Sequence, residues 1–166
     1  GEEIVGLYPL LEGDTCCLLA CDFDGPTWSP DALGLLEAAD CWRVPAYLER
    51  SRSGQGGHVW IFFTRPVSAV LARRLGTGLL RETMVARGEM ELTSYDRLFP
   101  NQDFMPKGGF GNLIALPLQK RARALGNTEF LDRELRPWPD PWRGLSLVQR
   151  LTPEALEALL DELPPL

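Results

Sequence analysis

An apolar segment that ends in two acids constrains the fold more than any other feature of this sequence. A strand is expected over about residues 15–23, and it delivers Asp22 and Asp24 two positions apart. Because side chains alternate between the faces of a strand, both carboxylates should point the same way. Such a pair repels unless a cation lies between the two acids, and oxygen ligands suit Mg²⁺ or Mn²⁺. The pair therefore predicts a metal site, with a solvated acidic turn at Asp24-Gly25 as the alternative.

A glycine-rich segment at residues 51–58 (SRSGQGGH) contains the only histidine of the chain. Its glycines allow backbone N–H groups to turn toward an anion, while Arg52, Ser53 and His58 supply donors for phosphate oxygens. The segment lacks the Gly-Lys-Ser/Thr of a Walker loop, and its glycines lead into a strand rather than a Rossmann helix. It predicts a triphosphate-binding loop. A flexible hairpin, with His58 as an ordinary strand residue, is the alternative.

The remaining pattern predicts alternating strands and helices. The first helix is expected to begin at Ser29 as N-cap and to run to about Asp40, because Ser29-Pro30 is a helix start signal. Thr152 followed by Pro153 predicts the N-terminus of a last amphipathic helix. The other expected elements are an extended segment at 44–50, a strand at 58–63, a helix at about 67–86 and short strands around 92–98 and 112–118.

Composition indicates one compact domain that is soluble and cytoplasmic. The chain has 166 residues, of which 45% are hydrophobic, which is enough for one core. It lacks a membrane-length apolar stretch, and its first residues do not resemble a signal peptide. The cysteines lack the paired spacing of a zinc site and are expected to be reduced thiols of the core: Cys16, Cys17, Cys21 and Cys41. The abrupt start and the proline-rich ending suggest a piece of a longer protein.

The charge is distributed unevenly along the chain. Residues 1–42 contain nine acids and no lysine or arginine, whereas residues 43–87 contain eight arginines and two glutamates. An acidic pole beside a basic track suits phosphate-bearing ligands, despite the net charge of −6. Solvated helix faces are the alternative explanation.

The order Asp-x-Asp, then Ser-Gly-x-Gly-x-His, then a further acid near a strand resembles the archaeo-eukaryotic primase superfamily of primase-polymerases. Four segments are closest to the primase domain of TOTE-type conflict systems: LYPLL (7–11), AYLERSRSG (46–54), SYDRLFPNQ (94–102) and MPKGGFGNLIALPLQ (105–119). The resemblance covers about residues 7–150. It implies an α+β fold in which a small α/β unit is joined to an RRM-like catalytic sheet, with residues 1–166 forming a single catalytic domain.

Carried over position by position, the resemblance implies roles for several residues. Asp22 and Asp24 match the first motif and would bind two divalent cations, Mg²⁺ or Mn²⁺. Ser53 and His58 match the second motif and would hold the triphosphate. Asp96 is the best match for the third acid, although Glu89, Glu91 and Asp103 lie nearby. Further expected nucleotide contacts in glycine-containing loops are Arg52, Gly54, Lys107 and Asn112.

The resemblance implies a nucleotidyltransferase that extends a DNA or RNA primer, or also starts one, using nucleoside triphosphates and a single-stranded template. No membrane partner is expected. A metal-dependent nuclease or phosphoesterase is the rival enzyme class, because paired acids and a histidine also serve hydrolysis. A non-catalytic RRM-like module that binds nucleic acid is the second rival.

Overall fold

A computed structural model describes residues 3–164 and contains both helices and strands. The strands are β1 (Gly6–Leu7), β2 (Thr15–Asp24), β3 (Tyr47–Arg50), β4 (Gly56–Ser68), β5 (Tyr95–Phe99), β6 (Ile114–Ala115) and β7 (Phe130–Leu131). The helices are α1 (Trp28–Cys41), α2 (Ala69–Arg87), α3 (Lys120–Arg123), α4 (Pro141–Ser146) and α5 (Pro153–Glu162).

The main sheet has five strands in the order β5-β2-β4-β3-β7, and its neighbouring strands are antiparallel. Its first four strands follow the chain order β2-α1-β3-β4-α2-β5. This is the βαββαβ arrangement of ferredoxin-like and RRM sheets. The expected α+β class and the RRM-like sheet are therefore confirmed.

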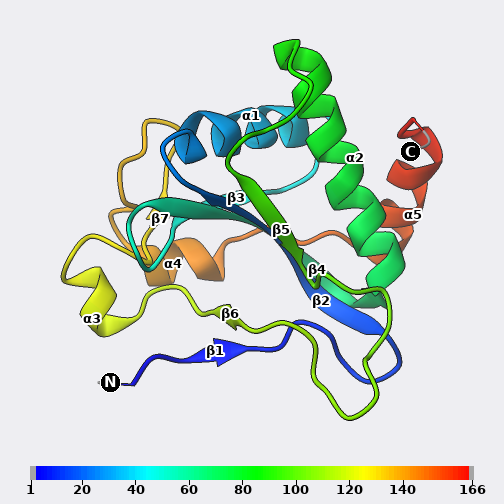
Figure 1. Cartoon of the computed structure of the whole chain (residues 1–166), viewed down its shortest axis with the longest axis horizontal. Coiled ribbons are helices and arrows are strands. Elements are labelled where there is room, and N and C mark those ends of the chain that lie inside the picture. The colour runs from blue at the N-terminus through cyan, green and yellow to red at the C-terminus, as the bar shows by residue number, and fades with distance from the viewer. Residues whose placement is uncertain (1–2, 165–166) are drawn as a thin grey trace.

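One face of the sheet is covered by helices (Figure 1). Alternate residues of β2 and β4 point to this face and are almost fully buried, among them Leu19, Cys21, Val59 and Ile61. They pack against the apolar sides of α1, α2 and α5. This layer holds the larger part of the apolar core.

The opposite face is only partly covered. Its apolar half contains Ala20, Trp60, Phe99 and Phe130, together with Ile114 of β6. β6 pairs with β1 in a separate two-stranded sheet, which lies on the side of the main sheet away from α1 and α2 (Figure 1). The charged half of this face remains accessible and carries the site described below.

Most of the expected elements are present, with two corrections. The first helix begins two residues earlier than expected, because Thr27 rather than Ser29 occupies its N-cap. Only Cys16 and Cys21 are buried, whereas Cys17 and Cys41 are exposed, so two of the four thiols lie outside the core. The last helix begins as expected, since the Thr152 side chain accepts a hydrogen bond from the Ala155 amide at 3.1 Å.

Candidate active site

Three carboxylates converge where β2 lies beside β5. Asp22, Asp24 and Asp96 each offer one oxygen, and these oxygens all lie within 4.8 Å of one another. The pairing explains the convergence, because Asp22 lies opposite Arg97 whereas the next residue of β2 lies opposite Tyr95. Asp96 is thus the extra residue of a β-bulge, a device that redirects a side chain at a functional edge. Strand β5, which carries Asp96, thus lies beside β2, which carries the other two acids.

The acidic cluster consists only of carboxylates, a donor set that suits a hard cation such as Mg²⁺ or Mn²⁺. Partial burial and the charges of Asp22 and Asp96 raise the pKa of Asp24 above its ordinary value. Part of the negative charge is balanced by Arg97, whose Nε lies 2.7 Å from an Asp96 oxygen. The residues present therefore fit a divalent cation, because the repulsion that raises the Asp24 pKa is what a bound cation relieves.

The other acids near β5 lie outside this cluster. Asp103 forms an ion pair with Arg73 at 2.6 Å, and Glu89 forms one with Arg87 at 2.8 Å. Glu91 lines a separate hollow behind the strand. Among residues 3–164, Asp96 is therefore the acid whose position suits a third ligand beside Asp22 and Asp24.

A buried acid on α1, which sequence reasoning missed, fixes the start of β5. Asp31 accepts hydrogen bonds from the Ser94 amide at 3.2 Å and from the Ser94 hydroxyl at 2.5 Å, and it pairs with Arg87 at 3.0 Å. The Ser94 carbonyl in turn accepts from the Asp24 amide at 2.7 Å. Helix α1 thus determines how the strands of Asp24 and Asp96 meet. No signal in the sequence indicated this role, because acids in the first turn of a helix are common and usually exposed.

His58 lies directly opposite Asp22 in the β2–β4 pairing, on the same face of the sheet. Its Nε2 is 3.4 Å from an Asp22 oxygen, and its Nδ1 is 2.9 Å from a Glu49 oxygen. Burial favours the neutral imidazole, but the hydrogen bonds and charges of Asp22 and Glu49 outweigh it and raise the His58 pKa to about 9. At neutral pH the ring is therefore an imidazolium whose two N–H groups both donate.

Glu49 is the second buried acid that sequence reasoning missed. It lies opposite His58 in the β3–β4 pairing and accepts a further hydrogen bond from Trp60 Nε1 at 2.7 Å. An alternation rule places Glu49, His58 and Trp60 on one face once the pairing is known. The pairing register itself was not predictable, so the sequence alone gave no signal for this contact.

The three glycines of the loop have different roles. Gly54 has φ +77°, and a Cβ there would lie 2.6 Å from Asn127 Oδ1. A Cβ at Gly56 would lie 2.5 Å from Asp24 Oδ1, and one at Gly57 would lie 2.6 Å from Trp28. Gly56 and Gly57 thus allow close packing beside the acidic cluster.

The sequence suggested that the backbone amides of the loop turn toward an anion. In the structure, two of these amides donate within the loop instead. The Gly54 amide donates to the Ser51 carbonyl at 3.0 Å, and the Gln55 amide donates to Ser53 Oγ at 3.1 Å. Gly54 therefore shapes the turn, and its contact with a nucleotide stays a prediction. The polar groups left facing the cleft are mainly side chains.

The acidic cluster and the loop share one open cleft of about 350 Å³. Asp22 and Asp24 line one part, and Ser51, Arg52, Ser53 and His58 line another. Phe99 and residues 113–115, on and beside β6, complete the wall. Acidic side chains and the side chains expected to bind phosphate therefore line a single space.

Three of the predicted nucleotide contacts do not line this cleft, namely Gly54, Lys107 and Asn112, and neither does Asp96. Lys107 and Asn112 belong to the long connection between β5 and β6, where Lys107 is exposed and Asn112 is partly buried. Their role in nucleotide binding stays a prediction. A neighbouring hollow of about 210 Å³ does share Arg52 with the cleft, and it is also lined by Lys120 and Arg121.

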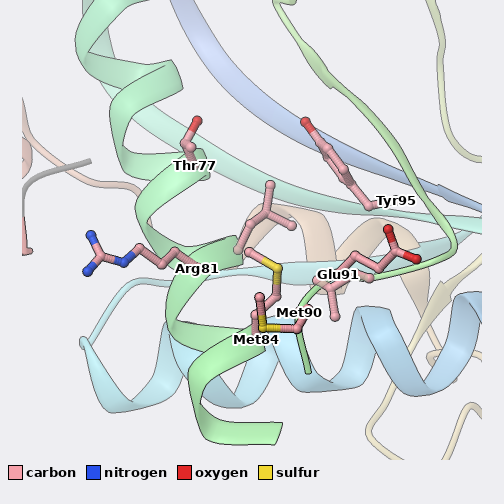
Figure 2. Close-up of a pocket in the computed structure, with 8 residues that line it drawn as sticks. Thr77, Arg81, Met84, Met90, Glu91 and Tyr95 are labelled. Atoms are coloured by element: carbon pink, nitrogen blue, oxygen red, sulfur yellow. The ribbon is translucent and has the colours of Figure 1, made fainter. Parts of the chain in front are cut away.

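A larger hollow of about 770 Å³ lies on the helix-covered side of β5. Figure 2 shows that Met84 and Arg81 line it from α2, with the Arg81 guanidinium directed away from the other side chains, and that Met90, Glu91 and Tyr95 line it from the segment that enters β5. Tyr95 packs edge-on against Phe23, whose side chain belongs to the core under the helices. This hollow is therefore separated from the carboxylate cluster by the strand.

None of the helices in residues 3–164 is long and apolar enough to cross a membrane. A comparison with curated proteins finds no match. The family model for the archaeo-eukaryotic primase domain of TOTE conflict systems matches residues 1–159, which is almost the whole chain. Together with the RRM-like sheet and its acidic triad, this match establishes that the chain belongs to the archaeo-eukaryotic primase domain family of TOTE conflict systems.

Proposed function

We propose that this domain is a metal-dependent primase-polymerase that transfers nucleotides from nucleoside triphosphates to a primer 3′-hydroxyl under the direction of a template. The observation that carries the proposal is the cleft that Asp22 and Asp24 line together with Ser53 and His58, with the Asp96 carboxylate beside the other two acids. Nucleotidyl transfer needs both groups of side chains. The acids would hold the cations at the reacting oxygens, and the hydrogen-bond donors would bind the triphosphate. The family to which the chain belongs supports a nucleotidyltransferase of this kind.

Asp22, Asp24 and Asp96 would hold two divalent cations, Mg²⁺ or Mn²⁺, which lower the pKa of an attacking hydroxyl and neutralise charge on the leaving pyrophosphate. The protein's own contribution is to keep the three carboxylates together before any ligand arrives. Two strands and the β5 bulge supply this arrangement. The contact between the Asp24 amide and the Ser94 carbonyl fixes it further.

The loop side of the cleft would bind the triphosphate. The imidazolium of His58 provides a positive donor beside the acids, and Arg52 and Ser53 extend the donor set away from them. Charged hydrogen bonds to phosphate oxygens are the strong ones, and a planar guanidinium suits them well. Lys107, Asn112 and Gly54 remain candidate contacts to phosphate or sugar.

The single-stranded template and the primer carry further phosphates. Arg52 lies between the cleft and the hollow that Lys120 and Arg121 line, so positive charge continues from one to the other. A continuous basic surface next to an active site suits a nucleic-acid backbone. We infer that part of the template or primer runs along this surface.

The deciding experiment is incubation of the domain with a primed single-stranded template, labelled nucleoside triphosphates and Mn²⁺ or Mg²⁺. Products longer than the primer are expected, and a chelator should abolish them. A primer that becomes shorter would indicate a nuclease instead. A primer that is bound but unchanged in length, with or without metal, would indicate a nucleic-acid-binding module. The same reaction on an unprimed template tests for de novo primer synthesis.

A further inference from the structure

Glu49 is a buried charged group to which the proposed reaction assigns no role. Its side chain is 1% exposed. One of its oxygens, Oε2, accepts hydrogen bonds from His58 Nδ1 at 2.9 Å and from Trp60 Nε1 at 2.7 Å. Burying a carboxylate is costly unless it is well paired, so these two donors account for its presence inside the sheet.

The two hydrogen bonds place Glu49 behind the cleft rather than in it. The β3–β4 register sets Glu49 opposite His58, and Trp60 lies two positions further along the same face of β4. The rings of His58 and Trp60 meet edge to face at 87°, with centroids 5.9 Å apart. The imidazole is thus held by the carboxylate at one nitrogen and by the indole along its side, which leaves Nε2 facing Asp22 and the cleft.

We propose that Glu49 is a positioning residue: by hydrogen-bonding His58 Nδ1, it fixes the imidazole so that Nε2–H is presented to the triphosphate of the incoming nucleotide. This inference rests on the proposed function. Residues that bind the far nitrogen of a functional histidine orient the ring and select which nitrogen carries the proton. Glu49 itself does not line the cleft and touches no substrate.

A purely structural Glu49 would fill space and satisfy Trp60, whereas a positioning Glu49 must act through His58. Two variants separate these roles. Glu49→Gln keeps a hydrogen-bonding side chain of the same shape, and an amide can pair with Nδ1 in either protonation state of that nitrogen. Glu49→Leu combined with Trp60→Phe removes the acceptor together with its second donor, so that the indole N–H is not left buried without a partner. Trp60→Phe alone is the matched reference for the double variant.

The full chain is used for two measurements. The first is titration calorimetry with a non-hydrolysable nucleoside triphosphate and Mn²⁺. The second is the ¹⁵N spectrum of the imidazole without nucleotide or metal, which is unambiguous because His58 is the only histidine in the sequence. Circular dichroism confirms that each variant is folded.

We expect the double variant to bind nucleotide at least about tenfold more weakly than Trp60→Phe, the loss typical of removing a charge-assisted hydrogen bond. Glu49→Gln should stay within about threefold of the wild type, because an amide still provides a hydrogen bond to the ring. The protected Nδ1–H signal of the wild type should disappear in the double variant. Primer-extension kinetics should show the loss in nucleotide KM rather than in kcat.

Equal nucleotide affinity for the double variant and Trp60→Phe would overturn the proposal. So would an equal loss in Glu49→Gln and the double variant, because orientation by a hydrogen bond should survive in the amide. A wild-type ring without a protected Nδ1–H would overturn it as well. A wild-type chain that extends no primer overturns the proposed function alone, since the imidazole spectrum is recorded without turnover.

Discussion

The two faces of the five-stranded sheet are built from alternate residues of the same strands, yet they are stabilised in opposite ways. On the helix-covered face, Leu19 and Ile61 are fully buried in a continuous apolar core. On the open face, further along the strands of the same sheet, Asp22, His58 and Glu49 form a network of charges. Burial of apolar area stabilises the first face. The open face holds like charges close together, and their repulsion opposes folding.

This difference teaches where stability and function reside in a small domain. A substitution on the helix-covered face should change the free energy of unfolding and leave the chemistry of the folded molecules intact. A substitution in the acidic cluster should impair the chemistry and change the free energy of unfolding less. The substitutions described next test whether stability and function are separated in this way.

The largest effect is expected from Asp22→Ala and Asp24→Ala, which should abolish nucleotide incorporation. The free energy of unfolding should stay the same or rise in Asp24→Ala, because partial burial and the charges of Asp22 and Asp96 raise the Asp24 pKa. It should fall in Asp22→Ala, because that substitution also removes a partner of the charged His58. Primer extension at saturating metal and urea unfolding of the metal-free protein measure the two quantities. Glu91→Ala, at an acid outside the cluster, is the control. Incorporation at the wild-type rate in either variant would contradict the assignment.

Asp96→Asn should lower metal-dependent incorporation by more than about a hundredfold, since even residues one layer behind a metal ligand typically contribute 10–100-fold. The amide keeps the shape of the side chain and removes only its charge. The same change is made at Asp103, and glutamine replaces Glu89 and Glu91, as three controls outside the cluster. If a control variant loses as much as Asp96→Asn, Asp96 is not the third ligand.

Ile61→Ala tests the opposite face. Its side chain is fully buried among core residues, so the substitution should lower the free energy of unfolding by about 2–5 kcal/mol, through lost apolar contact and the cavity left behind. The fraction that remains folded should extend primers at the normal rate. Chemical unfolding and extension rates per folded molecule check this. A large drop in rate without a drop in stability would show that the two faces are coupled.

The helix-covered face was largely predictable from the sequence, and the open face was not. Apolar periodicity indicated the strands at β2 and β4 and the long helix α2, because regular burial on one side leaves a regular pattern. The pair Asp22 and Asp24 was found for the same reason, since alternation alone places two acids on one side of a strand. Thr152 was recognised by its position before a proline at a helix start.

What local patterns could not supply depends on contacts between distant segments. Asp96 was identified through the family resemblance, because the bulge in the β2–β5 pairing that brings it to the cluster leaves no local pattern. Two buried acids were missed altogether. Glu49 reads as a surface residue of a short strand until the register with His58 is known. Likewise, Asp31 satisfies Ser94 from 63 positions away. Buried charges are costly alone and acceptable in pairs, so their positions cannot be inferred one residue at a time.

The ion pairs of His58 predict a pH dependence of stability on the open face. The His58 pKa is raised from 6.5 to about 9 in the folded protein. A raised pKa means that the folded state holds the proton more tightly, so this contribution is complete below pH 6.5 and is lost as the pH rises through 9. At 1.36 kcal/mol per pH unit, it amounts to about 3 kcal/mol.

The test compares unfolding of the wild type and His58→Gln in chelator at several pH values. The difference in free energy between the two proteins should be largest below pH 6.5 and should shrink between pH 6.5 and 9. Taking the difference removes the contributions of the groups that both proteins share. A difference that does not change with pH would show that folding does not raise the His58 pKa.

The smallest effect is expected for nucleotide affinity in His58→Ala. This variant tests whether, on the open face, the residues that bind metal are distinct from those that bind phosphate. His58 donates toward the cleft from beside Asp22 but is not one of the three clustered acids. Losing one charged hydrogen bond typically costs about 1.5–3 kcal/mol, which corresponds to a loss of nucleotide affinity of about tenfold or more. Metal affinity should change less, because the carboxylates remain in place. Calorimetry with a non-hydrolysable nucleotide and then with Mn²⁺ alone measures both. If metal affinity falls more than nucleotide affinity, His58 serves Asp22 rather than the triphosphate, and the open face is one indivisible charge network.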